Sequence, residues 1–315
     1  MEAVLKRLRE SGVEAGDDAA FIDVAGVKLA FACDMLVWST DVPPGVEYRD
    51  VGWKAAVSCI SDLAAKGAKP IALLASLGLP GSVMVDEALE LVEGVRAASV
   101  EYGAAFRGGD TNEAREVVID VAGLGLLKHP PIKRSGARPG DYVAVTGPFG
   151  STGAALHMAL RGLKPRDEEL RSRLWEALRR PRARLKEGLA LASSRSASAS
   201  IDSSDGLALS LHQLAEASGV GIRVDYVPVS EEARAFAEEF GLNSLDLALY
   251  GGEEYELVVA IPPGKWGDAV AAVEEAGGAL LKIGVVTRGK GVRLCLKERS
   301  GELPRRGWEH LKPSR

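Results

Sequence analysis

The sequence predicts a globular protein of two domains, each built from helices and strands. Its 315 residues exceed the length at which a single hydrophobic core usually stops growing, although one long domain remains an alternative. Apolar residues make up 46% of the chain and charged residues 26%, as in proteins with a packed core. A polar stretch at 129–141, rich in proline and glycine, separates two sets of expected elements. We therefore place the boundary near residue 135, between an N-terminal domain of residues 1–135 and a C-terminal domain of residues 136–315.

In the first half, apolar runs predict strands, and apolar residues at helical spacing predict helices. Gly67 is expected to follow the end of the first helix, with Pro70 shortly beyond it. The first apolar run is expected to stop at Asp34. The expected elements are strands at 27–33, 71–79 and 117–127, a brief strand within 104–111, and helices at 50–66 and 85–102.

The second half is predicted to begin with a strand and a glycine turn, followed by three helical stretches. The small-residue tract at 193–200 is interpreted as a turn and a tight strand, because it leads directly into IDSSDG and a strongly helical segment. The expected elements are strands at 142–147, 222–226, 255–261, 280–286 and 292–296, and helices at 156–161, 170–180, from Pro181 onward, at 207–219 and at 265–276.

Charge and cysteine content narrow the class of protein. The net charge is −5 with both signs mixed along the chain, so no basic face is offered to nucleic acid. Cys33, Cys59 and Cys295 are odd in number and widely separated, which argues against a disulfide framework and a zinc site. The amino terminus lacks an export signal, and no apolar stretch is long enough to span a membrane. We expect a cytoplasmic protein with reduced thiols.

Aspartates at breaks between elements are the main candidates for chemistry. No Walker loop and no strand followed by G-x-G-x-x-G is present, so ATP binding would need another device. Magnesium prefers oxygen ligands and bridges carboxylates to phosphates, which makes several aspartates at element tips suitable for a polyphosphate site. The candidates at breaks are Asp17, Asp18, Asp34, Asp110, Asp202 and Asp205.

Each of these aspartates also has a purely structural interpretation. Aspartate is common in turns and at helix N-termini, and Asp202 and Asp205 precede a predicted helix. Asp62 is different, because it falls inside a predicted helix, where aspartate is a poor helix former. The glycine turn at 147–152 is open to both interpretations, as a phosphate cradle or as a plain turn.

Six sequence blocks, taken in order, resemble the thiamine-monophosphate kinase family and cover nearly the whole chain. The ordered set is far more specific than any one block. The blocks are GDDAA at 16–20, SDLAAKGAKP at 61–70, GGDT at 108–111, RSGARPGD at 134–141, IDSSDGL at 201–207 and GGEEYEL at 251–257.

The resemblance implies an α+β fold shared with aminoimidazole ribonucleotide synthetase, with mixed sheets covered by helices and a homodimer formed through the N-terminal domain. It also implies Mg²⁺-assisted transfer of the ATP γ-phosphoryl group to thiamine monophosphate. Asp62, Asp205 and Arg134 would act in the transfer. The magnesium ligands it implies are Asp17, Asp18, Asp34, Asp62, Asp110, Asp202 and Asp205; the ATP contacts are Gly109, Asp110, Arg134 and Ser204; and the substrate contacts are Asp41, Glu253 and Trp308.

The sequence departs from the family pattern at a few positions. Ala32 and Cys33 stand where the family has hydroxyl side chains, Asp41 replaces a histidine, and Leu311 replaces a closing aromatic residue. These departures leave the substrate end of the pocket less well defined than the metal end.

Several other functions remain as alternatives. Among related enzymes, aminoimidazole ribonucleotide synthetases carry a DGVGTK block that is absent here. Selenophosphate synthetases need a reactive cysteine or selenocysteine near the start, whereas the first cysteine here is Cys33 in an apolar strand. Hydrogenase maturation proteins end in cysteine, whereas this chain ends in KPSR. A binding protein without turnover is the alternative from another class. The retained aspartates argue against it, and a turnover assay separates the two.

Overall fold

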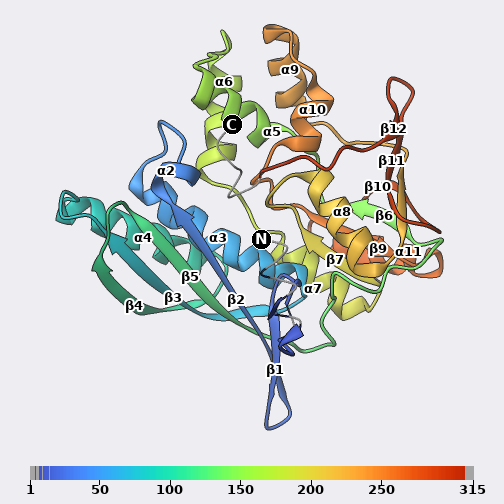
Figure 1. Cartoon of the computed structure of the whole chain (residues 1–315), viewed down its shortest axis with the longest axis horizontal. Coiled ribbons are helices and arrows are strands. Elements are labelled where there is room, and N and C mark those ends of the chain that lie inside the picture. Colours follow the sequence, from blue (N-terminus) through green and yellow to red (C-terminus); the bar gives the residue numbers. More distant parts are fainter. Residues whose placement is uncertain (1–3, 5–6, 9, 14, 309–315) are drawn as a thin grey trace.

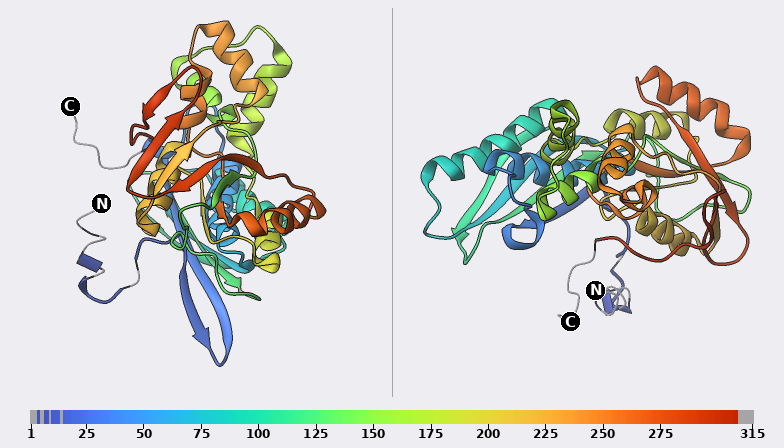
Figure 2. Two further views of the ribbon diagram at one scale, coloured as in Figure 1. Left: turned by 90° about the vertical axis from the view of Figure 1, so that its right-hand side faces the viewer. Right: turned by 90° about the horizontal axis from the view of Figure 1, so that it is seen from above.

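The computed structural model describes residues 4, 7–8, 10–13 and 15–308. Its strands form two sheets, one from each half of the sequence (Figure 1). Viewed from above, the elements of the first half lie beside those of the second, and the chain has an elongated outline (Figure 2). The α+β fold with two mixed sheets and covering helices is confirmed.

The first sheet has five strands in the order β1-β2-β5-β3-β4. Helices α3 and α4 pack together and cover one face. On the other face Phe31, Cys33 and Met35 alternate along β2 and are exposed, as is Leu74 of β3. The elements are β1 (Ala20–Val24), β2 (Val27–Val37), α2 (Trp38–Asp41), α3 (Tyr48–Ala65), β3 (Lys69–Leu79), α4 (Val85–Glu101), β4 (Ala105–Glu113) and β5 (Val118–Leu126).

The second sheet has seven strands in the order β12-β11-β8-β10-β6-β9-β7 and is covered on both faces. Val258 of β9 packs in one core with α8, whereas Val259 packs in another with α7 and α11. The elements are β6 (Tyr142–Val145), α5 (Ser151–Arg161), α6 (Glu168–Arg179), α7 (Leu185–Ser194), β7 (Ala199–Asp202), α8 (Leu207–Ser218), β8 (Gly221–Val224), α9 (Glu231–Phe240), α10 (Ser244–Tyr250), β9 (Leu257–Ile261), η1 (Pro263–Lys265), α11 (Trp266–Glu275), β10 (Leu281–Thr287), β11 (Gly291–Cys295) and β12 (Ser300–Glu302).

Helix α3 is buried along almost its whole length and contacts both halves of the molecule. Its first turn is closed by a capping box in which the side chain of Asp50 accepts from the Glu47 amide at 3.3 Å. It packs on α4, β2 and β5 in the first half and on α7 and β7 in the second. The approach to α7 is so close that a Cβ on Gly188 would lie 2.0 Å from the Ala64 carbonyl oxygen. Side chains on α3 can therefore reach groups from both sheets.

Most predicted elements are confirmed, with differences at their ends. The helix expected from Pro181 onward is α7, which begins at Leu185 and ends at Ser194, inside the small-residue tract. The prediction that the first strand stops at Asp34 is wrong, because β2 continues to Val37 with Asp34 paired to Val121. No predicted element corresponds to β1, α2, α9, α10 or β12. Leu311 lies outside the described residues, and the boundary near 135, in the segment between β5 and β6, stays a prediction.

Candidate active site between the two sheets

Three carboxylates from distant parts of the sequence meet where α3 lies against β7. Asp18 comes from the segment before β1, Asp62 from the last turns of α3 and Asp202 from the end of β7. Their nearest carboxylate oxygens all lie within 4.8 Å of one another. The packing of α3 against β7 thus brings together three of the aspartates predicted to hold metal.

Hydroxyl groups of α3 orient two of the neighbouring carboxylates. Ser61 Oγ donates to Asp202 Oδ2 at 2.8 Å across the junction of the sheets. One turn earlier, Ser58 hydrogen-bonds the side chain of Asp34 on β2. This bond satisfies a half-buried carboxylate on the face of β2 that lies against α3, so the strand can continue past Asp34.

Asp202, Asp34 and Asp62 have pKa values raised above those of free aspartates. Burial raises the pKa of Asp202 to about 7, and the charge of Asp18 adds to the effect. Burial likewise raises the pKa of Asp34 to about 6, against the opposing effect of the Ser58 hydrogen bond. The pKa of Asp62 lies well above its ordinary value because of burial and the charges of Asp202, Asp34 and Asp18. The part of the cluster around Asp62 and Asp202 therefore carries more negative charge than the nearby cationic side chains balance.

Two cationic side chains lie at the Asp17–Asp18 end of this cluster. Arg134 donates from Nε to Asp18 Oδ1 at 2.5 Å, and its terminal nitrogen pairs with the same oxygen. The Lys66 ammonium lies 2.7 Å from Asp17 Oδ1 and 2.6 Å from Asp18 Oδ2. The backbone amide of Arg134 also donates to the Asp17 carboxylate.

The cluster suits a magnesium ion on its Asp62 side. Asp18 Oδ2 is buried and accepts no hydrogen bond from the described residues, since the nearby Lys66 ammonium is not in hydrogen-bond geometry. The pKa values of Asp62 and Asp202 are raised, and carboxylate oxygens such as these are the ligands that magnesium takes in proteins. Asp18, Asp62 and Asp202 would hold the ion.

A cavity of about 660 Å³ opens next to this cluster and collects most of the other predicted residues. Asp34 and Asp205 contribute carboxylates to its lining, and Ser58 contributes a hydroxyl group from α3. Aromatic side chains line other parts of the wall. The predicted residues that line the cavity are Asp34, Asp41, Ser204, Asp205, Glu253 and Trp308, and those the sequence analysis did not single out include Trp38, Ser58, Tyr250 and Tyr255.

The backbone of the GGEEYEL block is held in an unusual conformation beside the cavity. Glu253 and Tyr255 have φ angles of 63° and 53°, although neither is glycine. Their amides donate to Ser204 O at 2.6 Å and Ser203 O at 3.0 Å, which ties this block to the IDSSDG block. Lys54 of α3, with its side chain 2% exposed, pairs with Glu253 at 2.9 Å. Glu253 is therefore fixed from two sides with its carboxylate at the cavity.

Of the remaining predicted contacts, Asp41 and Trp308 line the cavity, whereas Asp110 does not. Asp41 accepts from the Val37 amide at 2.8 Å and closes the turn after β2. Trp308 is 46% exposed, and its amide donates to Asp205 O. Asp110 is exposed on β4, in register with Ser76 of β3. It thus lies on the sheet face opposite to that of Gly109, which pairs with Ala75, and its predicted metal and ATP roles stay predictions.

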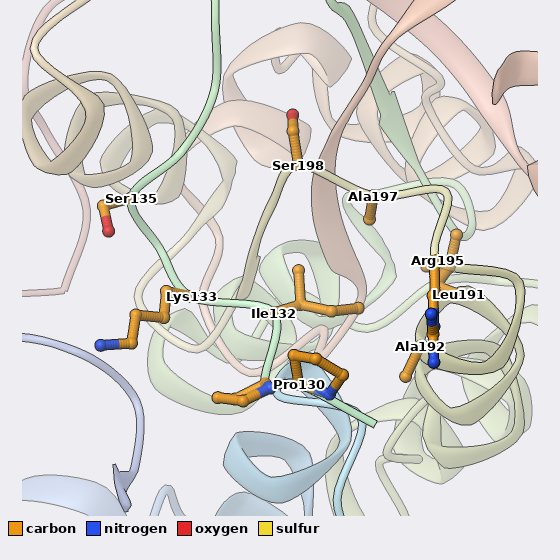
Figure 3. A pocket seen from close by; sticks show the side chains of 10 residues that line it. Pro130, Ile132, Lys133, Ser135, Leu191, Ala192, Arg195, Ala197 and Ser198 are labelled. Atoms are coloured by element: carbon orange, nitrogen blue, oxygen red, sulfur yellow. The ribbon is translucent and has the colours of Figure 1, made fainter. Parts of the chain in front are cut away.

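Another cavity, of about 360 Å³, lies between the 130–135 segment and the end of α7 (Figure 3). Its two basic side chains, Lys133 and Arg195, lie on opposite sides of the cavity in this view and do not converge on one point. It contains none of the aspartates predicted to hold metal. We assign no role to it.

Comparison with known proteins places both halves of the chain in one family. Residues 16–127 match the model of the AIR synthase related protein N-terminal domain, and residues 138–297 match that of the C-terminal domain. The thiamine-monophosphate kinase of Pyrococcus horikoshii is 37% identical over 94% of this chain and 91% of its own length. That of Pyrococcus abyssi is 39% identical over 94% of this chain and 90% of its own.

Solved structures give the same result. "AaThiL complexed with AMPPCP and TMP" superposes with a TM-score of 0.87 at 30% identity, covering 98% of this chain and 96% of that one. Thiamine monophosphate kinase from Aquifex aeolicus superposes with a TM-score of 0.82 at 28% identity, covering 96% of this chain and 98% of that one. The chain therefore belongs to the thiamine-monophosphate kinase family of AIR synthase related proteins.

Proposed function

We propose that this protein transfers the γ-phosphoryl group of ATP to the phosphate of thiamine monophosphate, producing thiamine diphosphate and ADP. One observation carries the proposal: a single cavity has acidic residues next to the three-aspartate cluster and aromatic residues elsewhere on its wall. A phosphate chain can thus meet the aspartates while an organic ring system lies against the aromatic residues. The similarity to thiamine-monophosphate kinases along nearly the whole chain supports the same assignment.

The chemistry needs positioning and charge neutralisation more than proton transfer. The acceptor phosphate is already anionic, so its oxygen attacks the γ-phosphorus while the bond from that phosphorus to the β-phosphate oxygen breaks and ADP leaves. Bound magnesium would neutralise charge that develops on the transferred group. Asp18, Asp62 and Asp202 would hold the ion, and Asp34 and Asp205 would provide further carboxylate ligands for metal in the adjoining cavity. Arg134 provides fixed positive charge at the edge of the cluster.

The aromatic part of the cavity fits a cationic ring. Thiamine carries a positive charge on its thiazolium ring, and aromatic faces and carboxylates both attract such a cation. Trp308 and Tyr250 supply faces, and Glu253, fixed by Lys54, supplies a carboxylate. Asp41 lines the same cavity, and the family resemblance implies a substrate contact for it.

Two further features belong to the proposal. The exposed apolar face of the first sheet, which includes Phe31 and Leu74, supports a homodimer formed through this face. The three unpaired cysteines support a reducing cytoplasmic setting. Among the described residues, no helix has both the length and the apolar character needed to cross a membrane.

The test is to incubate the purified protein with ATP, magnesium and a panel of phosphomonoesters, and to identify any product by mass. Thiamine diphosphate should form from thiamine monophosphate, and free thiamine should not be phosphorylated, because the described lining of the cavity contains no histidine and its carboxylates are assigned in this proposal to metal and substrate binding. Phosphorylation of thiamine without use of the monophosphate would contradict the proposal. Binding of both ligands without product would favour the non-catalytic alternative.

A further inference from the structure

Lys66 is buried completely inside the aspartate site. It follows α3 as its C-cap residue, and its side chain has no exposed surface. The ammonium nitrogen lies 2.7 Å from Asp17 Oδ1, 2.6 Å from Asp18 Oδ2 and 2.8 Å from the Ser200 carbonyl oxygen. Three oxygens, two of them charged, thus surround one ammonium group.

This arrangement is that of a cation site already filled by the protein. A buried ammonium is tolerated only where charged and polar partners replace its lost hydration. A divalent ion between Asp17 and Asp18 would use the same carboxylate oxygens, Asp17 Oδ1 and Asp18 Oδ2, that now face Lys66. The other oxygen of Asp18 faces Arg134. Asp17 and Asp18 therefore have no common oxygen pair free for a metal ion.

We infer that Lys66 is a resident cation that takes the place of a magnesium ion between Asp17 and Asp18. Asp17 then serves as a partner of Lys66, and metal is confined to the Asp62 and Asp202 side of the cluster, where Asp18 can still contribute because each carboxylate oxygen has two lone pairs. The inference deepens the proposed function and rests on it, because it concerns how the charge of the same phosphate site is balanced. It narrows the predicted metal ligands by removing Asp17.

Lys66 also connects the two halves of the molecule, because its ammonium group contacts residues from both. Its acceptor Ser200 belongs to β7 of the second sheet, whereas Asp17 and Asp18 precede the first. A metal ion at this place would dissociate when magnesium is scarce, whereas a lysine cannot leave. The contact between the halves through Lys66 therefore does not depend on magnesium.

The test counts metal ions without measuring turnover. Free Mn²⁺ is followed by electron paramagnetic resonance during titration of the protein with Mn²⁺ in the presence of a non-hydrolysable ATP analogue. Lys66→Met removes the charge and shortens the side chain by its terminal atom, so this variant should bind one more Mn²⁺ than the parent. Magnesium should also raise the melting temperature of Lys66→Met more than that of the parent. Lys54→Met is the matched control, because Lys54 is also buried but pairs with Glu253, and its ion count should equal that of the parent.

Two further variants keep the test decisive if Lys66→Met does not fold. Asp17→Asn leaves the pair between Lys66 and Asp18 intact and should bind as many ions as the parent, whereas Asp62→Asn should bind one fewer. The inference is overturned if Asp17→Asn loses an ion, or if folded Lys66→Met binds the same number as the parent. Failure of the proposed function would appear separately, as absence of thiamine diphosphate from a parent protein whose ion counts follow this pattern.

Discussion

At the residue scale, Asp62 is the side chain whose replacement separates a metal role from a structural one. It lies on α3 among Asp202, Asp34 and Asp18, and its raised pKa shows that its charge is costly without a cation. We expect Asp62→Asn to slow thiamine diphosphate formation roughly a hundredfold. This corresponds to a rise of about 3 kcal/mol in the activation free energy, which is part of the several kcal/mol that a metal ion contributes to transition-state stabilisation. Measured without magnesium, its melting temperature should not be lower than that of the parent, because a like-charge repulsion is removed.

Asp268→Asn is the matched control for this substitution. Asp268 also lies on a helix, but it is exposed and pairs only with Lys265 among the interactions described. Its activity and melting temperature should match the parent, as expected for a surface position. An Asp62→Asn enzyme whose rate lies within about threefold of the parent, or roughly 0.6 kcal/mol, would end the metal assignment.

A second residue-scale prediction concerns Glu254, which lies between α10 and β9 and whose side chain contacts the start of α5. Its Oε1 accepts from the amides of Gly150 at 2.6 Å and Thr152 at 3.2 Å, yet burial raises its pKa to about 7. The folded protein therefore holds this proton more tightly than the unfolded chain. The stability that the group contributes is present below its ordinary pKa and is lost as the pH rises through about 7.

Glu254→Gln keeps an acceptor for both amides and removes the titration. Between pH 5 and pH 8 the parent should therefore lose more stability than the variant, with roughly 3 kcal/mol as the upper limit from the pKa shift. Urea unfolding at several pH values measures the difference. Parallel curves for the two proteins would show that Glu254 does not titrate in this range.

Sequence reasoning found the acidic residues of the site more readily than their partners. Asp62 was recognisable because aspartate is unfavourable inside a helix. Lys66, Ser61 and Lys54 carry no such signal, since lysine and serine are ordinary helix residues whose importance depends on what another part of the chain brings next to them. Asp110 is the opposite case, because the sequence identifies the residue but not its place in the structure. Its block matches a family pattern, but which sheet face it occupies follows from strand register.

At the element scale, small residues set the distance between α3 and α4. A Cβ on Gly94 would lie 2.1 Å from the Arg49 carbonyl oxygen and 2.7 Å from the Trp53 amide nitrogen. We expect Gly94→Ala to force the two helices apart and to lower the free energy of unfolding by about 1 to 3 kcal/mol. Chemical denaturation measures this loss.

Gly267→Ala provides the comparison for Gly94→Ala. Gly267 also lies in a helix, α11, but nothing lies within 4 Å of the position that its Cβ would take. Alanine there should leave stability unchanged or raise it by up to about 1 kcal/mol, because alanine is the better helix former. If both variants were equally stable, close packing would not be what requires glycine at residue 94.

The elements that were predicted well are those with long apolar patterns. Strand β5 and helices α4 and α8 follow such patterns, and their ends fall close to the predicted ones. Among the elements that were missed, α2 and β12 are short, and β1 depends on tertiary contacts. Strand β1 forms by pairing with β2 in a hairpin whose turn includes Ala25 and Gly26, both with positive φ, and four of its five side chains are exposed.

At the scale of the whole molecule, the uncovered face of the first sheet leads to a prediction about assembly. Phe31 is 46% exposed and Leu74 is 47% exposed on this face. We expect Phe31→Glu combined with Leu74→Glu to convert a dimer into a monomer, because two charges would be buried in the interface. Light scattering at micromolar concentration measures the molecular mass.

Val100→Glu is the control for the dimer prediction. Val100 is 67% exposed on α4, which covers the other face of the first sheet, so a charge there should leave the dimer intact. A parent protein that is already monomeric would remove the proposed dimer. A doubly substituted protein that stays dimeric would place the interface elsewhere.

The burial of α3 has a consequence for the way the molecule unfolds. Its amides lie beneath α4 and the first sheet on one side and against α7 and β7 on the other, so neither half can open without uncovering this helix. Hydrogen exchange at these amides should therefore proceed only through global opening, and they should be among the last in the chain to exchange. The two sheets would then behave as one cooperative unit and melt in one transition, despite their separate cores.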